Sequence, residues 1–566
     1  MAGTTTGAAR PAGALAGPHA SRGGASRWTV LVVLCSSLLL VALDATVLHV
    51  AVPAVTEDLR PSAVDLLWIV DAYPLVAASL LILFGTLGDR VGRRRVLLLG
   101  YGIFGIASAI GAFATDPHVL IAARALLGVG GAMIMPATLS LLRQVFPDRR
   151  ERALAIGIWS ATAAVGAAIG PLLGGFLVEH FWWGSVFLIN IPLMVLAIPI
   201  GRWLLPESTA KHSGPWDVLG ALMAAVGLFG VVLAIKKVGA GAEPFEPFVV
   251  APAVVGAALL TLFVRRQRRR DCPLVDFSVI SRRGFGTSVG CIILAMLALV
   301  GLQLIAVQYL QLVLGLTPLE AGIRLIPLTF AAIAGGLLGS RLLARFGPRA
   351  MVMAGFVLTA VAVLGLISLG QQDRPAILCI GFVLLGFGLE MVLFGSYESM
   401  LSDSPADQAG GAAAIGETSY QLGAGIGIAL LGSVMNAVYS PGVADVPGVS
   451  TAAGKHAGNS LGEAYSVAAK LGGDAGAALR TAARDAFVHG MHVTLVVSAL
   501  LLLGGAAMAM RLPRHMECGT PAEEALDAAD YPEVASAPSR DRRRPSEGPH
   551  VRKHYATVQP GRSAGD

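Results

Sequence analysis

The sequence predicts an all-α polytopic membrane protein, whose helices cross the bilayer many times. Only 14% of its 566 residues are charged, whereas about 25% are charged in ordinary soluble domains. Hydrophobic residues make up 55% of the chain, and the mean hydropathy is +0.70. The apolar residues form long continuous runs, unlike the alternating strands of about ten residues in a transmembrane β-barrel. These observations exclude a soluble multidomain enzyme and a wholly disordered chain.

Fourteen apolar runs are long enough to cross the bilayer. A transmembrane helix needs about 20 apolar residues to span roughly 30 Å of hydrocarbon. An even number of crossings places both termini on one side, and the short loops of that side hold most of the Lys and Arg residues. Because these residues accumulate in the cytoplasm, we expect both termini there. The predicted spans are 28–52, 65–88, 94–114, 118–141, 152–178, 183–205, 216–236, 247–264, 286–312, 318–343, 350–370, 375–401, 410–438 and 488–510.

The segments outside these runs are expected to lie in water. Residues 1–27 have no apolar core, so we expect a disordered cytoplasmic arm rather than a signal peptide. Residues 439–487 form a long outer loop, in which 462–487 could fold as one or two surface helices. The tail 511–566 is rich in Pro, Arg, Asp and Glu, a composition typical of disordered cytoplasmic segments.

Each candidate motif for enzymatic or metal chemistry lacks a residue or a structural context that it needs. We therefore expect that the protein is not an enzyme and binds no cofactor or metal. The five cysteines are far apart and fit neither a disulfide framework nor a ligand spacing. Gly411 and Gly416 have phosphate-loop spacing, but Glu417 stands where the loop needs Lys. The hydrolase-like string at 286–290 begins an apolar helix instead of following a strand. His489 and His492 lack a third metal ligand.

The loop after the second span carries the string GTLGDRVGRRR at 85–95. Its glycines allow a tight turn, Asp89 can cap or pair across helices, and the Arg cluster meets the inner surface. The string closely resembles the loop signature of the major facilitator superfamily. The resemblance assigns a conformational role to Gly85, Asp89, Arg90, Gly92 and Arg93.

Three further strings extend the resemblance. SRLLARFGPR at 340–349 is a weaker copy, with Ala344 at the place of Asp89, and indicates two homologous halves. RALLGVGG at 124–131 and GAAIGPLLGG at 166–175 are also similar to family strings, the second to the signature of exporters. That string could serve as a hinge or simply allow close packing of small residues, and the sequence does not decide between these roles. Its residues of interest are Gly166, Gly170, Pro171 and Gly174.

Fourteen spans resemble the drug:proton antiporter branch of that superfamily. This implies a six-helix half at 28–205, two inserted helices at 206–264 and a second six-helix half at 265–510. LDATVLHVAVP at 43–53, WIVDAY at 68–73 and GAAAIGETSYQ at 411–421 look most like segments of pumps for quaternary ammonium compounds and other lipophilic cations. Acids found in some of these pumps are missing at Gly416, at Gln421 and near Ala332, which argues against divalent substrates.

Insertion of a charged residue into the bilayer costs about 2.5 to 3.5 kcal/mol, so we expect each charged residue inside a predicted span to have a function. Six of these residues stand out, five acids and one base: Asp44, Asp71, Glu390, Glu398, Glu417 and Arg124. A cavity lined by such an excess of acids attracts cations. Glu390 is deep enough to need a partner, whereas Glu398 lies near the inner end, where solvation is an equal alternative.

Similar depths place Arg124 near both Asp44 and Asp71, so we expect it to pair with one of them and leave the other acid to titrate. Glu417 and Gln421 share one helix face near Tyr420, which suits a cation site, with a structural role for Glu417 as the alternative. Further candidate wall residues are Trp68, Tyr73, Trp159 and Phe394.

The resemblance implies a proton-coupled antiporter in the bacterial plasma membrane that exports lipophilic cationic drugs, biocides or dyes. It would use the proton motive force and exchange one cation for protons at the same carboxylates, with no nucleic acid or obligate protein partner. A dedicated exporter of an endogenous antibiotic or metabolite is the alternative. An importer is disfavoured by the exporter-like string, and a membrane sensor by the buried charges and the lack of a signalling domain.

Overall fold

The computed structural model describes residues 27–61, 63–207, 217–239, 246–270, 273–274, 282–404, 408–444 and 446–513. Within these residues the chain forms helices and no strand. The expected cytoplasmic arm up to residue 26 and the tail from residue 514 lie outside the described residues. The all-helical prediction is confirmed for the described part of the chain.

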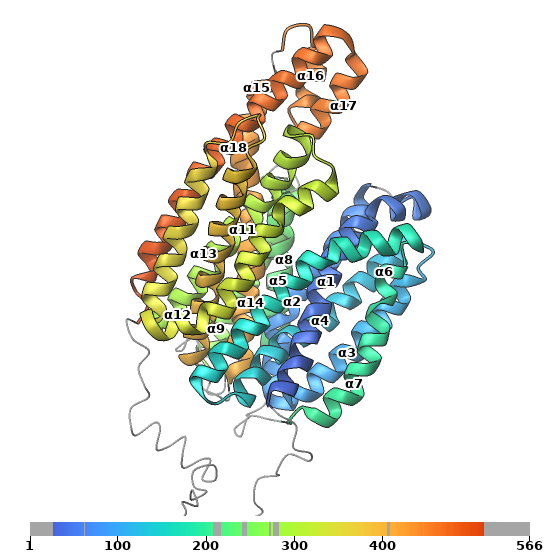
Figure 1. Cartoon of the computed structure of the whole chain (residues 1–566). Helices are drawn as coiled ribbons and strands as arrows, with labels where there is room; N and C mark the ends of the chain where they lie inside the picture. The colour runs from blue at the N-terminus through green and yellow to red at the C-terminus, as the bar shows by residue number, and fades with distance from the viewer. Residues whose placement is uncertain are drawn as a thin grey trace, which may run out of the picture. The chain divides into compact units, whose positions relative to one another are not determined.

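The helices follow the predicted runs (Figure 1). The amino-terminal half holds α1 (Arg27–Leu59), α2 (Ala63–Val91), α3 (Arg93–Ala112), α4 (Pro117–Val145), α5 (Arg149–His180), α6 (Ser185–Leu188) and α7 (Asn190–Leu204). The inserted pair is α8 (Val218–Gly239) and α9 (Pro247–Gln267). The carboxy-terminal half holds α11 (Arg283–Gln308), the π-helical turn η1 (Tyr309–Val313), α12 (Pro318–Leu366), α13 (Pro375–Ser402), α14 (Ala409–Tyr439), α15 (Pro441–Ala444), α16 (Thr451–Ala457), α17 (Leu461–Leu471) and α18 (Gly473–Ala509).

Twelve helical segments among the described residues are long and apolar enough to cross a membrane. One of them, Glu320–Leu366, covers two of the predicted spans. Helix α5 is not among the twelve, although it covers the predicted span 152–178. A membrane protein of many helices is therefore confirmed, and the number of fourteen crossings stays a prediction.

A glycine turn marks the same place in both halves. Gly92 separates α2 from α3 at φ 121°, and Gly347 interrupts α12 at φ 76° and ψ 166°. Glycine adopts this region without the steric cost that a Cβ brings. Gly92 and Gly347 also occupy corresponding places in the two basic strings at 85–95 and 340–349. The matching turns support the internal repeat.

The helices pack within each half and across one junction. In the first half α1 packs on α5, and α4 packs on α2 and α3. In the second half α11 packs on α14 and α13, and α12 packs on α13 and α18. Contacts of α2 with α14 and of α5 with α12 join the halves. The inserted helix α8 packs on α9, α2 and α14, so it contacts this junction directly.

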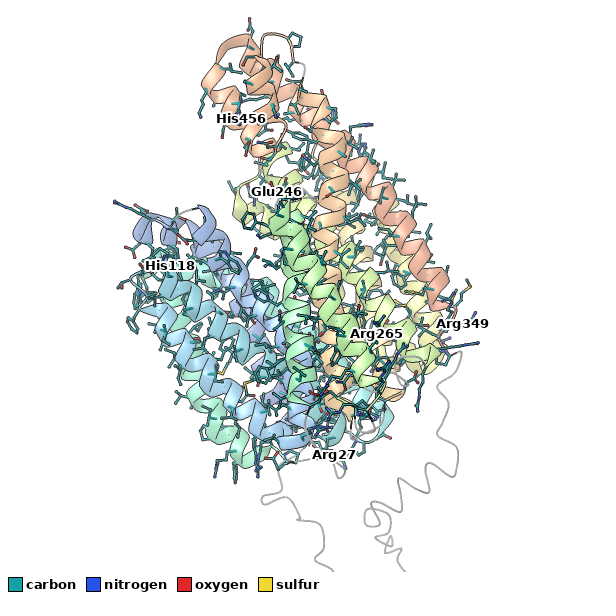
Figure 2. The ribbon with its side chains drawn as sticks, turned by 180° about the vertical axis from the view of Figure 1, so that it is seen from behind. Arg27, His118, Glu246, Arg265, Arg349 and His456 are labelled. Carbon is teal, nitrogen blue, oxygen red and sulfur yellow. The ribbon has the colours of Figure 1, made fainter. Side chains whose placement is uncertain are left out.

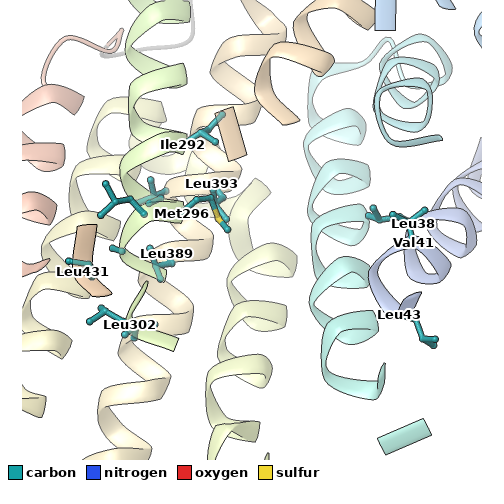
Figure 3. Close-up of a cluster of buried hydrophobic side chains, with 14 of the residues drawn as sticks. Leu38, Val41, Leu43, Ile292, Met296, Leu302, Leu389, Leu393 and Leu431 are labelled. Carbon is teal, nitrogen blue, oxygen red and sulfur yellow. The ribbon is translucent and has the colours of Figure 1, made fainter. Parts of the chain in front are cut away.

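Large apolar side chains form the cores of both halves (Figure 3). On the first side lie residues of α1, and on the second lie residues of α11, α13 and α14. The labelled examples are Leu38, Val41 and Leu43, and Ile292, Met296, Leu302, Leu389, Leu393 and Leu431. Other apolar side chains point outward, such as Trp203 and Phe248, which are 71% and 76% exposed. Apolar surface of this extent fits a chain whose surroundings are lipid.

The outer segment is more helical than expected. Helix α18 begins at Gly473 rather than near 488, so it extends into the predicted loop. A surface helix is present as α17, where Tyr465 donates from its Oη to the carbonyl oxygen of Leu312 at 2.6 Å. Arg484 of α18 donates from its Nε to Tyr465 Oη at 2.8 Å. These bonds tie α17 and α18 to the end of the second half.

The labelled charged residues lie toward opposite ends of the helices. Arg27, Arg265 and Arg349 lie toward one end of the helices, and His118, Glu246 and His456 lie toward the other (Figure 2). The first group belongs to loops predicted to be cytoplasmic, where Lys and Arg accumulate.

Candidate functional site

A buried ion pair joins α1 to α4. Arg124 Nη1 donates to Asp44 Oδ2 at 2.9 Å, and the two side chains are 2% and 0% exposed. Asp44 Oδ1 accepts a hydrogen bond from Asn190 Nδ2 at 2.9 Å, and Arg124 Nε donates to the carbonyl oxygen of Ile69 at 3.1 Å. The guanidinium also lies 4.8 Å from the centroid of the Tyr73 ring. Of the two expected partners of Arg124, the structure selects Asp44.

Asp71 of α2 pairs with a different base. Lys236 Nζ of the inserted helix α8 contacts Asp71 Oδ1. The Lys236 and Asp71 side chains are 24% and 35% exposed, so this pair is partly open, unlike the enclosed pair of Arg124 and Asp44. We expected the second acid to have no basic partner. Asp71 instead pairs with Lys236.

Glu417 of α14 lies at the junction of the halves. It is 3% exposed and accepts a hydrogen bond from Tyr397 Oη of α13 at 3.0 Å. The Tyr397 ring meets Trp159 of α5 edge-on, with the centroids 6.3 Å apart. Trp159 Nε1 donates in turn to Thr138 Oγ1 of α4 at 3.3 Å. A chain of polar and aromatic contacts thus runs from Glu417 into the first half.

The two acids of α13 differ in their partners. Glu390 is 6% exposed, and its Oε1 accepts a hydrogen bond at 2.5 Å from Ser160 Oγ of α5. Glu398 is buried rather than solvated, and it accepts hydrogen bonds from Ser402 at 3.1 Å and Arg152 at 3.4 Å. In the part of the chain that the structure describes, Glu390 and Glu417 pair with hydroxyl groups and with no Lys or Arg side chain.

The other candidate lining residues divide between the two regions. Tyr73 lies beneath Arg124, and Trp68 is half-buried on the same helix. Tyr420 and Gln421 are half-buried on α14, three and four residues after Glu417 on the same helix. The structure therefore brings Tyr420, Trp159, Glu390 and Glu417 together, and places Asp44, Tyr73 and Arg124 in a second cluster.

Asp89 joins the halves at the end expected to be cytoplasmic. Its Oδ1 and Oδ2 accept hydrogen bonds from the backbone N–H groups of Gly410 and Gly411, at 3.0 and 2.9 Å. These groups begin α14, where the helix dipole favours a negative charge. Arg93 Nη2 lies 2.8 Å from Asp89 Oδ1. Arg90, the residue after Asp89, is half-buried.

The remaining motif glycines allow close approach of backbones. A Cβ on Gly85 would lie 2.5 Å from the Ala414 Cβ of α14. On α5, Cβ atoms at the three repeated glycines would lie 2.8, 1.9 and 2.7 Å from atoms of α1. The α5 residues are Gly166, Gly170 and Gly174, and the α1 residues are Ala42, Thr46 and Val47. Helix α5 continues past Pro171, so the string serves close packing here, and its role as a hinge stays a prediction.

Comparison with known proteins identifies the family. The sequence model of the Major Facilitator Superfamily matches residues 34–428. The chain belongs to this superfamily. The crystal structure of the human organic anion transporter MFSD10 has the same superfamily fold, with a TM-score of 0.54 at 15% identity over 84% of this chain and all of that one.

Several relatives within the Major Facilitator Superfamily align along most of the chain. The multidrug efflux pump LfrA of Mycolicibacterium smegmatis is 39% identical, covering 87% of this chain and 97% of LfrA. The methyl viologen resistance protein SmvA of Salmonella typhimurium is 36% identical, and the alignment covers 84% of this chain and 97% of SmvA. The tetracenomycin C resistance and export protein of Streptomyces glaucescens is 32% identical, and the alignment covers 85% of this chain and 91% of that protein. The chain is therefore a multi-pass membrane transporter related to multidrug efflux and antibiotic-resistance exporters.

Three polar residues of the site were not indicated by the sequence. Lys236 ends a predicted span, where a long basic side chain can reach the membrane interface, so it was not counted among the buried charges. Asn190 and Tyr397 are uncharged, and only the tertiary fold brings them to Asp44 and Glu417. Their positions inside apolar runs were the available signal. No group of three His, Cys, Asp or Glu side chains suited to a metal is found among the described residues.

Proposed function

We propose that this transporter is a proton-coupled antiporter that exports lipophilic cations by alternating access. The observation that carries the proposal is the pair of buried carboxyl groups, Glu417 and Glu390, at the junction of the halves. A buried carboxylate without a basic partner is costly, so a proton or a cation has to supply the missing positive charge. The aromatic rings of Tyr397, Trp159 and Tyr420 add faces that attract a lipophilic cation.

Competition between proton and cation couples the two fluxes. The carboxylic acid, open to the cytosol, releases its proton inward, and a cation from the cytosol or the inner leaflet binds the resulting carboxylate. The halves then rock about their junction, and protons from outside bind the carboxylate and release the cation. The energy comes from the proton motive force, with no cofactor, nucleic acid or obligate protein partner. Asp44 and Arg124 position α1 against α4 in this scheme, and Asp71 offers a second anionic group.

We further propose fourteen crossings in a bacterial plasma membrane, with both termini cytoplasmic. The glycine turn inside α12 supports two crossings in that segment, and the length of α5, 32 residues, supports one more. The placement of Arg27, Arg265 and Arg349 toward one end supports the orientation (Figure 2).

A second candidate function is export of an endogenous antibiotic or metabolite. The resistance and export protein for tetracenomycin C and the probable actinorhodin transporter of Streptomyces coelicolor favour it, the latter being 33% identical over 75% of this chain. The two functions share the fold and differ in the charge of the cargo.

Efflux of ethidium tests the first function. We would measure it in cells, with and without a protonophore, for the intact protein and for Asp71→Asn and Glu417→Gln at equal membrane abundance. Because each substitution removes an anionic group from the site, we expect protonophore-sensitive efflux to be lost. Glu463→Gln is the control, since Glu463 belongs to the outer helix α17 and bonds to Asn459.

The outcomes separate the two functions. Unchanged efflux in both carboxyl variants would contradict the assigned site. An intact protein that exports no cationic dye would contradict cation export and favour the dedicated exporter.

A further inference from the structure

We propose that Lys236 of the inserted helix α8 is a resident counter-ion of Asp71, which a cationic substrate has to displace. The inference rests on the proposed cation export and adds a specificity-determining residue to it. Lys236 would compete with the cargo for one carboxylate, and would thereby weaken binding and speed release.

The first observation is the contrast between the two ion pairs. Arg124 and Asp44 are 2% and 0% exposed and form a pair that separates only at the cost of a buried charge. Lys236 and Asp71 are 24% and 35% exposed. Because neither side chain of this pair is fully enclosed, exchange of Lys236 for another cation leaves no fully buried charge without a partner. Only the second pair is suited to open and close repeatedly.

The second observation is the position of α8. This helix packs on α2, which carries Asp71, and on α14, which carries Glu417. The residue before Lys236 contacts α14, since a Cβ on Gly425 would lie 3.4 Å from Ile235 Cγ2. Lys236 is thus held by a helix that contacts both halves, and rocking of the halves changes its distance from Asp71.

The third observation is the chemistry of the two cations. Lysine is a compact, strongly hydrated charge on a flexible stem of four carbons. A lipophilic cation gains from apolar and aromatic contacts that hydrated Lys236 does not use. The lysine therefore gives way to cations with a large apolar surface, and keeps small hydrated cations from Asp71. The inserted helices acquire a direct role in selecting the cargo.

Binding of tetraphenylphosphonium to the purified full-length protein in lipid nanodiscs tests the inference. We expect Lys236→Met to bind this monovalent cation roughly twofold to fivefold more tightly, the range expected for removing a partly exposed ion pair. Lys236→Arg should bind as the intact protein does. Lys237→Met is the matched control, because Lys237 Nζ contacts the carbonyl oxygen of Phe248 rather than an acid, at 3.3 Å. In an Asp71→Asn background, Lys236→Met should have no further effect.

Acylation of lysine gives a second measurement. The chain holds only six Lys residues, so mass spectrometry can follow each site separately. We expect tetraphenylphosphonium to increase the modification of Lys236 and to leave Lys237 unchanged. Asp71→Asn should increase it without any ligand.

The results distinguish failure of the inference from failure of the proposed function. Cation binding that needs Asp71 but is unchanged by Lys236→Met would overturn the inference alone. Weaker binding in Lys236→Met would also overturn it, since a structural pair gives that result. An intact protein that binds no tetraphenylphosphonium would overturn the proposed function and the inference with it.

Discussion

Asp44 is held on both of its oxygens, by Arg124 and by Asn190, inside a bundle that excludes water. Removing one charge of such a pair leaves the other charge buried alone. We expect Asp44→Asn to lower the stability of the fold by about 3 kcal/mol. The measurement is the thermal unfolding midpoint in detergent. Adding Arg124→Met should recover most of the loss, and a double variant no more stable than Asp44→Asn would contradict this account.

Asp217 precedes α8 and is tied to α9 and to its own helix. Burial opposes its ionisation, but hydrogen bonds from Arg266, the Gly220 N–H, Arg270 and Gln267 together hold the pKa of Asp217 well below its usual range. A lowered pKa stabilises the fold above the pKa of the unfolded chain, about 3.9. This stabilisation is lost as the pH falls through the lower pKa of the folded state.

The corresponding prediction concerns Asp217→Asn. We expect this variant to be less stable than the intact protein by about 2 kcal/mol between pH 5 and 8, as for hydrogen bonds to a charged group. The difference should shrink below about pH 4. Unfolding midpoints recorded as a function of pH check this, and a difference that is constant down to pH 3 would contradict it.

Helix α5 lies against α1 through glycines, and a single methyl group tests how close that contact is. A Cβ on Gly170 would lie 1.9 Å from Thr46 Oγ1, whereas on Gly175 the nearest atom, Val50 Cγ1, would be 3.9 Å away. We expect Gly170→Ala to cost about 2 kcal/mol through overpacking and Gly175→Ala to be tolerated. Membrane abundance and thermal unfolding measure both. Equal behaviour of the two variants would disprove the close contact, whereas rescue by Thr46→Ala would support it.

At the scale of elements, periodicity and charge predicted the helices better than their ends. The runs at 318–343 and 350–370 were separated correctly at the turn near Gly347, although α12 continues through it. Helix α18 extends outward past its apolar run, because packing against α17 rather than lipid stabilises its first turns. Apolar content marks where a helix meets lipid and says little about helix outside the bilayer.

The burial of the candidate residues was predictable to a similar degree. Acids inside apolar runs pointed to Asp44, Glu390 and Glu417 as buried groups, and the structure buries all three; their roles stay predictions. Their partners depend on which helices meet, and the sequence left Asp44 and Asp71 as equal choices for Arg124. Tertiary packing decides between them, and a pattern within one helix carries no information about it.

Across the whole molecule, the carboxylate of Asp89 is one of the charged groups that join the two halves. Asp89 accepts from two N–H groups of α14, and its counterpart in the second half is Ala344. The repeat is therefore asymmetric at this point. A charge-assisted hydrogen bond is worth about 1.5 kcal/mol, so its loss shifts an equilibrium between two arrangements of the halves about tenfold.

Asp89→Asn should accordingly open the junction beneath Gly85 more often. We would measure maleimide modification of Ala414→Cys, a buried position on α14 facing Gly85, in a protein without native cysteines. The rate should rise about tenfold in Asp89→Asn. Ala107→Cys, buried within the first half, is the control. A rise at both positions would indicate general loosening and contradict a specific opening.

Asp217 fixes one end of α8, so a small tilt of this helix moves its other end by a larger distance. Lys236 lies near the opposite end, about 28 Å along the axis at 1.5 Å per residue. Tilting such a rod by about 10° around its fixed end carries the far end through about 5 Å, more than the separation of any ion pair. A rotation that barely disturbs the packing near Asp217 therefore suffices to part Lys236 from Asp71.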